Sequence, residues 1–243
     1  MADERSSLID AAGSLGTLLT PGSATSLLRL IDELTKWNGA YNLTAITRRD
    51  EMITHHLLDS LSVRTALHGI TVADVGTGAG FPGLPLAIVE PERRFTLIDS
   101  NNKKVRFVGH AARTLALTNV TPVHVRAENF AAGASAWTAA KVAAASTAGR
   151  SGTAVAASSA SPGAPPVAAP FDTVVARAFA ALPELLRLVS PLCGPDTHVL
   201  AMKGKRPDDE LAAVPADWKV LDMRPLAVPG LNEERHLVTL QRT

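Results

Sequence analysis

Residues 72–83 read VADVGTGAGFPG, and this stretch decides the fold. An apolar run ends at Asp74 and Val75, and a cluster of four glycines begins directly after it. A buried strand that leads through closely spaced glycines into a helix is typical of α/β sheets that bind a ligand at the carboxyl edge of their strands. Glycines allow the backbone to approach such a ligand closely. The stretch therefore predicts a binding site at the end of this strand, beside Gly76 and Gly78.

Three classes of ligand use loops of this kind. A P-loop needs Lys-Ser or Lys-Thr after its last glycine, and neither pair follows here. Residues 78–83 match the dinucleotide pattern G-x-G-x-x-G, but Asp74 would bring negative charge close to a pyrophosphate, and Pro82 and Pro85 lack the N–H groups that a phosphate needs. S-adenosylmethionine has no phosphate, and its ammonium and sulfonium groups favour a nearby carboxylate. The loop therefore favours S-adenosylmethionine.

Two further acids follow strand-like runs. Asp99 ends the run FTLID, where an acid accepts hydrogen bonds from ribose hydroxyls. Such an acid suits both NAD and S-adenosylmethionine and does not separate them. Glu128 follows the next run, at a position where an adenine is commonly contacted. Both acids indicate a ligand that contains a nucleoside.

After Gly69 the chain alternates between β-rich runs and helical stretches. The first five runs have helices or long connections between them, which predicts a parallel sheet with crossovers. The last two are joined by the short polar segment PGLNEE, which predicts an antiparallel hairpin at one edge of the sheet. We therefore expect residues 68–243 to form a Rossmann-like, doubly wound α/β domain. The seven predicted strands are residues 71–75, 95–99, 122–127, 171–178, 197–204, 219–228 and 235–242.

Residues 1–67 are predicted to form a small N-terminal helical cap. Apolar residues between 27 and 37 recur at spacings of three and four, with Ser23 as the expected N-cap and Asn38-Gly39 as the expected end of the helix. A second amphipathic helix is expected after Arg48. Residues 131–170 are rich in Ala, Ser, Gly and Pro, and we interpret them as a low-complexity insertion within the domain.

The composition excludes few functions. With 46% hydrophobic and 19% charged residues the chain can bury a core, and its formal net charge of +1 leaves room for a local basic face. Cys193 is the single cysteine, so no disulfide within the chain is possible. The start of the chain has no signal-peptide pattern, and no apolar run is long enough to span a membrane. We expect a soluble cytoplasmic protein that does not insert into membranes.

Several blocks, taken in their order, match a known family. DVGTGAGFPGLPLAI, LIDSNNKKVRFV, VRAE, VVARAFAALPELL, MKG and ERHLV resemble the RsmG (GidB) family of bacterial 16S ribosomal RNA guanine-N7 methyltransferases, and NLTAITRRDEMITHHLLDSL resembles its N-terminal signature. The resemblance spans about residues 25–243, except for the insertion, which departs from the family pattern. It implies a class I methyltransferase with S-adenosyl-L-methionine as cofactor. The implied partner is 16S ribosomal RNA in the small subunit or its assembly intermediate.

The resemblance also implies roles for individual residues. Gly76 and Phe81 would lie against the cofactor, Asp99, Ser100 and Asn101 near its ribose, Ala127 and Glu128 beside its adenine, and Arg177 at the mouth of the active site. We also count Asp74, Gly78 and Arg177 among the residues expected to bind the cofactor. Guanine N7 carries a free lone pair, so methyl transfer needs alignment and no general base. We expect Arg177 and Lys203 at the active edge. The candidates for contact with RNA are Arg48, Arg49, Arg126, Lys203, Lys205, Arg206 and Arg235.

Two other functions stay open. One is a NAD(P)-dependent oxidoreductase or epimerase, although the chain has no Tyr-x-x-x-Lys pair and its single tyrosine, Tyr41, lies in the cap. The other is a non-catalytic RNA-binding assembly factor. We do not expect a metal site at His55, His56 and Asp59, because adjacent histidines on a helix point about 100° apart. Whether the protein is a monomer is not encoded in any motif, and a monomer is our expectation.

Overall fold

The computed structural model describes residues 2–126 and 170–243. Ala127, Glu128 and the predicted insertion, apart from Pro170, lie outside the described residues.

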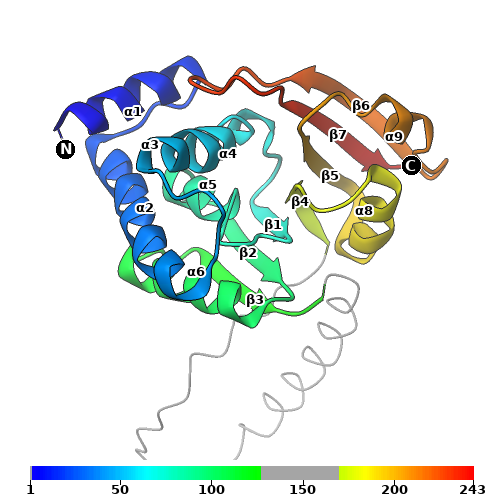
Figure 1. Ribbon diagram of the computed structural model, residues 1–243. Helices are drawn as coiled ribbons and strands as arrows, with labels where there is room; N and C mark the ends of the chain where they lie inside the picture. The colour runs from blue at the N-terminus through cyan, green and yellow to red at the C-terminus, as the bar shows by residue number, and fades with distance from the viewer. Residues whose placement is uncertain (1, 127–169) are drawn as a thin grey trace, which may run out of the picture.

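The described residues form one seven-stranded sheet with the order β3-β2-β1-β4-β5-β7-β6 (Figure 1). β1 to β5 run parallel, whereas β7 pairs antiparallel with both β5 and β6. The predicted doubly wound sheet and its C-terminal hairpin are confirmed. The three apolar residues of β1, Val72, Ala73 and Val75, are fully buried, as expected for a central strand covered on both faces. The strands are β1 (Thr71–Val75), β2 (Arg94–Asp99), β3 (Val120–His124), β4 (Phe171–Arg177), β5 (Cys193–Lys203), β6 (Trp218–Pro225) and β7 (His236–Arg242).

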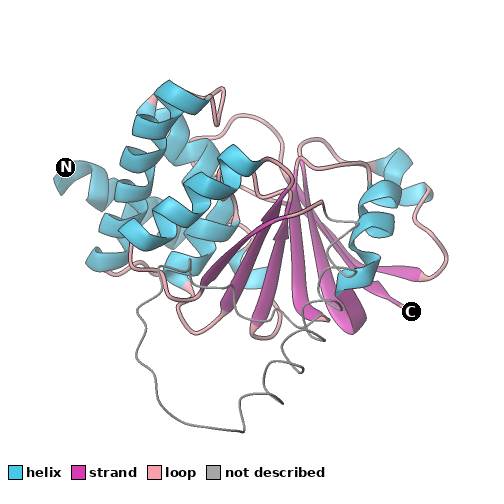
Figure 2. Ribbon diagram, turned by 90° about the horizontal axis from the view of Figure 1, so that it is seen from below, coloured by secondary structure: helices cyan, strands magenta, loops and turns pink. Residues whose placement is uncertain are grey.

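Helices cover both faces of the sheet, as Figure 2 shows. The cap helices pack together with α5 and α6 on one face and share a single apolar core with them. On the other face, α8 buries Leu182, Leu185 and Leu186 against β4 and β5 in a second core. The helices of the described residues are α1 (Ala2–Ser14), α2 (Pro21–Tyr41), α3 (Arg49–Met52), η1 (Ile53–Leu58), α4 (Asp59–Leu61), η2 (Arg64–Ala66), α5 (Gly83–Val89), α6 (Asn102–Thr114), α8 (Leu182–Val189), η4 (Ser190–Leu192) and α9 (Asp208–Ala212).

The long cap helix α2 has the predicted apolar stripe but different ends. Its N-cap is Thr20, whose Oγ1 accepts a hydrogen bond from the backbone N–H of Ser23 at 3.0 Å, so the prediction of Ser23 as N-cap was wrong. Pro21 occupies the first turn, where its missing N–H costs nothing. The helix also continues past Asn38-Gly39 and ends where Asn42 adopts the left-handed conformation, with φ 51°.

The second cap helix is not a single α-helix. It runs from α3 through a π-helical segment, η1, into α4. Met52, Leu57 and Leu61 are still buried, as the periodic pattern predicts. A π-helical turn inserts an extra residue into the helix and is frequently found at functional sites.

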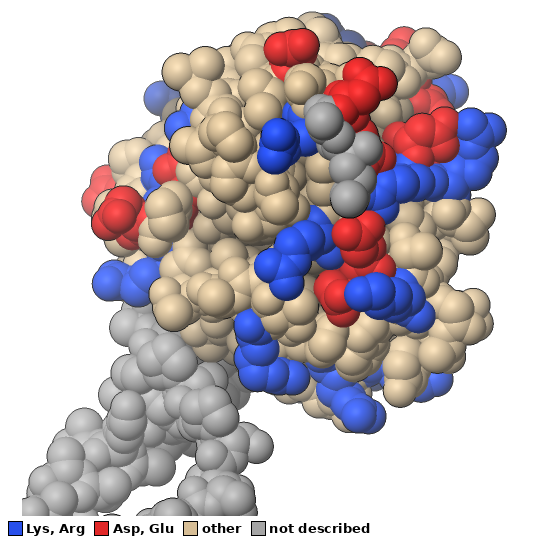
Figure 3. Space-filling model, turned by 90° about the vertical axis from the view of Figure 1, so that its left-hand side faces the viewer, with Lys and Arg blue, Asp and Glu red and all other residues tan. Residues whose placement is uncertain are grey.

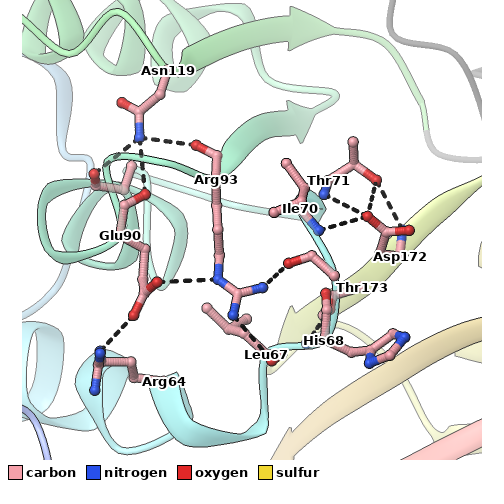
Figure 4. A network of polar contacts seen from close by, with 12 residues as sticks. Arg64, Leu67, His68, Ile70, Thr71, Glu90, Arg93, Asn119, Asp172 and Thr173 are labelled. Atoms are coloured by element: carbon pink, nitrogen blue, oxygen red, sulfur yellow. Dashed lines mark hydrogen bonds and ion pairs between the residues drawn. The ribbon is translucent and has the colours of Figure 1, made fainter.

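A polar network joins the cap to the amino ends of the strands (Figure 4). The Asp172 carboxylate accepts hydrogen bonds from the backbone N–H groups of Ile70 and Thr71 at 2.7 and 2.8 Å. The Arg93 guanidinium donates to the Gly69 carbonyl oxygen and pairs with Glu90, whose other carboxylate oxygen lies 2.7 Å from Arg64. Because this edge is filled by structural contacts, the opposite, carboxyl edge of the sheet is the one available to a ligand. Within the described ranges, no helix is both long and apolar enough to cross a membrane.

Candidate functional site

The glycine loop follows β1 and is held by its own backbone hydrogen bonds. Gly76, Gly78 and Gly80 have φ of 71°, 61° and 88°, a region that side chains disfavour. The amides of residues 76 and 77 both donate to the Ile98 carbonyl oxygen, at 2.9 and 3.1 Å. Those of residues 80 and 81 donate to the Thr77 carbonyl oxygen at 3.0 and 2.9 Å. Five amides of the loop, including that of Gly78, are thus bonded within the protein and do not form an anion-binding nest.

Asp74 lies beneath this loop and has no exposed surface. Its Oδ2 atom accepts hydrogen bonds from the Thr77 hydroxyl at 2.6 Å and from the Gly83 N–H at 2.8 Å. Burial raises the pKa of the Asp74 carboxyl to about 6, although both hydrogen bonds act in the opposite direction. Its Oδ1 atom has no hydrogen-bond partner among the described residues. Through these two hydrogen bonds, Asp74 joins the glycine loop to the start of α5.

Asp99 stands at the end of β2 and connects two loops. Its Oδ2 accepts from the Gly78 N–H at 2.8 Å, and its Oδ1 accepts from the Asn101 N–H at 2.7 Å. Asn101 in turn caps α6, because its side-chain oxygen accepts from the Lys103 N–H at 3.0 Å. Asp99, Ser100 and Gly76 line a cavity of about 290 Å³ together with Ile98, Val125, Lys104, Arg126, Ala178 and Phe179. We call it the loop cavity.

Phe81 is not among the residues that line the loop cavity. Its ring is 3% exposed and stacks on His56, with 4.7 Å between ring centroids and 20° between ring planes. The Arg177 guanidinium carbon lies 5.7 Å from the centroid of the Phe81 ring. Burial, and then the charge of Arg177, lower the pKa of His56 to about 4, so His56 is neutral at pH 7. Phe81 thus connects the glycine loop to the cap, and its predicted contact with the cofactor stays a prediction.

A second cavity, of about 430 Å³, lies between the cap and the ends of β4 and β5. We call it the cap-side cavity, and its lining includes His55, His56, Asp59, Arg177 and Arg235. Ala178 lines both cavities. The predicted residues Arg177, Lys203 and Arg235 therefore meet at this cavity, on the carboxyl edge of the sheet.

Several of the predicted basic residues are paired with acids. Arg48 pairs with Asp50, and Arg206 with Asp208, both at 2.6 Å. Arg49 joins α1 to α2 through Glu4 and Asp32. On the cap face seen in Figure 3, blue and red side chains are accordingly interspersed.

Lys203 is mostly buried, with 14% of its side chain exposed. Its Nζ donates to the Ala180 carbonyl oxygen at 2.6 Å and pairs with Glu210 at 2.7 Å. It holds the segment that follows β4, whereas Arg126 and Lys205 are more exposed.

Sequence reasoning missed the roles of two residues at this edge, the aromatic Phe179 and the acidic Asp59. Phe179 is 37% exposed, and its ring covers Gly76 so closely that a Cβ at Gly76 would overlap it. Its place directly after β4 was the signal that could have found it. Asp59 is 2% exposed and pairs with Arg177 and Arg235, which no local pattern reveals.

His55, His56 and Asp59 do not gather around a metal position. Over residues 2–126 and 170–243, no group of three or more His, Cys, Asp and Glu side chains is arranged to hold a metal ion. Cys193 is partly buried, and burial raises the pKa of its thiol to about 12, which makes it a poor nucleophile.

Comparison with solved structures agrees with the fold. A SAM dependent methyltransferase from Aquifex aeolicus superposes with a TM-score of 0.50 at 16% identity, over 79% of this chain and 93% of that one. TrmN from Thermus thermophilus gives the same TM-score at 17% identity, over 76% of this chain and 47% of that one. At this identity the likeness concerns the fold alone.

Sequence comparison identifies the family. Proteins named Ribosomal RNA small subunit methyltransferase G are 38% identical in Escherichia fergusonii, over 99% of this chain and 98% of that protein, and 41% identical in Pseudomonas paraeruginosa, over 100% and 96%. The corresponding protein of Methylococcus capsulatus is 43% identical over 89% of this chain and 88% of its own. The family model GidB, described as rRNA small subunit methyltransferase G, matches residues 23–146 and 155–238. The chain therefore belongs to the rRNA small subunit methyltransferase G family.

Proposed function

We propose that this protein transfers the methyl group of S-adenosyl-L-methionine to N7 of a guanine in 16S ribosomal RNA. Membership of the family supports the reaction class and the small-subunit RNA substrate. The observation that carries the choice of cofactor is the glycine loop, whose amides are bonded to Ile98, Thr77 and Asp99. A loop with these donors occupied suits a ligand without phosphate.

The loop cavity fits the nucleoside of this cofactor. Each Asp99 oxygen accepts one backbone N–H and keeps a lone pair for a ribose hydroxyl. Ile98 and Val125 offer apolar surface next to it, and Gly76 and Gly78 let the backbone come close. We propose that Ser100, Asn101, Ala127 and Glu128 complete this site.

Bound S-adenosylmethionine supplies an electrophilic methyl group on a sulfonium. The residues of the chain have to align the acceptor with that methyl group, because the displacement is in line. N7 carries a free lone pair and has no proton to lose, so the displacement needs no general base. We infer that the acceptor is oriented by Arg177 at the end of β4, and that no protein group removes a proton.

The RNA partner contacts the same edge. Guanine N7 is shielded in the deep, narrow major groove of A-form RNA, so the target lies in an irregular or opened region of the small subunit or its assembly intermediate. We propose Arg126, Lys205 and Arg235 as contacts. Arg235 shares the Asp59 carboxylate with Arg177 at the cap-side cavity, whereas Arg48, Arg49, Lys203 and Arg206 have carboxylate partners of their own and would contribute only after these are displaced. We further propose that the protein acts as a cytoplasmic monomer, with residues 1–67 as cap and 68–243 as methyltransferase domain.

Measurements of ligand binding distinguish the proposed methyltransferase from the NAD(P)-dependent alternative. Calorimetry with the purified protein should give binding of S-adenosylmethionine and S-adenosylhomocysteine and none of NAD or NADP. Binding of NADP without either sulfur-containing nucleoside would overturn the choice of cofactor.

The substrate is tested by deleting the gene and mapping 7-methylguanine in the small-subunit RNA. We expect one 7-methylguanine to disappear and to return when the wild-type gene is restored. An unchanged pattern of modification in the deletion strain would show that the substrate is a different one.

A further inference from the structure

The wall between the two cavities is a strained segment. Ala178 follows β4, lines both cavities and has φ 49°, a conformation that residues with a Cβ rarely adopt. Such strain persists only where the surroundings enforce it, and it concentrates at functional sites. The residues on each side line different cavities: Arg177 lines the cap-side cavity, and Phe179 lines the loop cavity.

Arg177 is fixed from three directions. Its Nη1 donates to the Asp59 carboxylate at 2.9 Å and to the His55 carbonyl oxygen, in the π-helical segment, at 2.8 Å. The Phe81 ring lies on another side, 5.7 Å from the guanidinium carbon. These contacts leave Arg177 about one-fifth exposed, so its guanidinium has a fixed place in the cavity wall.

Asp59 connects Arg177 to a second arginine. The Arg235 Nε lies 3.3 Å from Oδ1, while Arg177 is bound to Oδ2. Arg177 ends β4, Arg235 precedes β7, and Asp59 begins α4 in the cap, so one carboxylate holds three distant segments around the cavity. With 2% of its side chain exposed, Asp59 itself has almost no surface for a ligand.

We propose that the cap-side cavity receives the target guanine, turned out of its RNA stack, that Arg177 donates a hydrogen bond to its O6, and that Asp59 is the positioning residue for Arg177. The inference rests on the proposed methyl transfer to guanine N7. On the edge of guanine that carries N7, O6 is the neighbouring acceptor, whereas adenine presents an N6 amino donor there. A guanidinium beside the wall shared with the loop cavity can bond O6 and leave N7 free for the methyl group. The same guanidinium disfavours adenine, which gives base selection.

A base analogue tests the hydrogen bond to O6. The target guanine of a small-subunit RNA is replaced by 2-aminopurine, which keeps N7 and lacks O6. RNA affinity is measured at equilibrium with S-adenosylhomocysteine present, so a variant without transfer activity still gives a value. Wild-type protein should bind the analogue at least about fivefold more weakly than guanine, given the usual loss per base contact. In Arg177→Ala that difference should shrink to less than about twofold, and an unchanged difference would overturn the assignment.

Asp59→Asn tests the positioning role. It should also reduce the difference between guanine and 2-aminopurine, although Asp59 does not touch the base, because Arg177 loses its anchor. If the substitution only impaired folding, it would weaken binding of both RNAs equally and leave the ratio of their affinities unchanged. An unchanged ratio would therefore contradict the proposal. Asp222→Asn is the matched control, because Asp222 pairs with Arg224 at 3.0 Å on the exposed edge strand β6. That variant should keep the wild-type ratio.

Arg235→Gln provides a variant at the other arginine that pairs with Asp59, which is about as exposed as Arg177. This substitution should weaken binding of both RNAs by a similar factor, as the loss of a contact to the RNA backbone does. It should keep most of the difference in affinity between guanine and 2-aminopurine. If discrimination instead depends on Arg235 and not on Arg177, the assignment of O6 to Arg177 is wrong. Wild-type protein that methylates no RNA at all would refute the proposed function, a result that differs from every outcome of the binding series.

Discussion

Two carboxylates beside the glycine loop have different environments and different roles. Asp74 is completely buried and bonds Thr77 and Gly83, so it holds the loop in shape. Asp99 is partly exposed and lines the loop cavity, so it can also meet a ligand. The sequence placed both acids correctly at strand ends. It could not tell that Asp74 points inward, because burial depends on the packing of α5 against β1 and β2.

Asp99→Ala should weaken S-adenosylmethionine binding and leave the fold largely intact. Removal of a charged acceptor that meets ribose hydroxyls costs about 3 kcal/mol, roughly a hundredfold in affinity. Calorimetry checks the affinity, and thermal unfolding checks the fold. Asp196→Ala, an exposed residue before the buried part of β5, is the control and should bind like wild type. Wild-type affinity in Asp99→Ala would remove Asp99 from the site.

His56 should make the protein less stable in acid. Its pKa is about 4 in the folded state and about 6.5 when unfolded, so the unfolded chain binds more protons between these values. The free energy of unfolding should therefore fall by ~3 kcal/mol from this group as the pH falls from 7 to 4. Asp74, whose pKa is raised, contributes with the opposite sign between pH 4 and 6.

Comparison of wild type with His56→Gln isolates this contribution from that of Asp74. Denaturant unfolding at pH 7 and pH 4 should show that the variant loses about 3 kcal/mol less than wild type over this range. Equal losses in both proteins would mean that His56 titrates normally in the fold.

At the scale of elements, the sheet was predictable and the cap was only partly so. Alternating β-rich runs and helices define a parallel sheet wherever they occur, and all seven strands formed close to the predicted positions. The π-helical turn of η1 was not predictable, because its apolar residues fit an α-helical period equally well. Its carbonyl at His55 meets Arg177, which is 122 residues away in the chain. Contacts over such a distance leave no periodic trace in one sequence.

A Gly→Ala change at the end of the glycine loop and one inside α2 should have opposite effects on stability. A Cβ at Gly83 would lie 2.7 Å from both Asp74 Oδ2 and a Leu97 carbon, so Gly83→Ala should destabilise the protein by roughly 1–3 kcal/mol. Gly39 lies inside α2 with no atom within 4 Å of an added Cβ, so Gly39→Ala should raise stability by about 0.5–1 kcal/mol. Denaturant unfolding measures both changes. Similar effects at the two positions would contradict the tight packing around Gly83.

At the scale of the whole molecule, charge is balanced and locally paired. The net charge of +1 comes from 24 basic and 23 acidic residues, and the arginines of the cap face mostly contact acids. Affinity for RNA should therefore come from the shape of the target and from a few cations at the carboxyl edge. The family of the chain was recognisable from its motif blocks, whereas these charge pairings required the fold.

The salt dependence of RNA binding should be shallow. If about three phosphates are neutralised, log K should fall with log salt concentration with a slope of about −2 to −3. Lys205→Ala should make the slope shallower by about 1, whereas Arg48→Ala, which removes an acid-paired cation, should leave it unchanged. A wild-type slope steeper than about −5 would mean that the paired arginines are released to bind phosphates.

The most direct measurement of the proposed activity uses purified protein, small-subunit RNA without modifications, and S-adenosylmethionine with an isotopically labelled methyl group. After digestion of the RNA to nucleosides, mass spectrometry locates the label. We predict one labelled methyl group per RNA, in 7-methylguanosine, and none when Asp99→Ala replaces wild type at the same cofactor concentration. Label in any other nucleoside would contradict guanine-N7 methyl transfer. So would RNA that stays unlabelled after incubation with wild-type protein that has been shown to bind the cofactor.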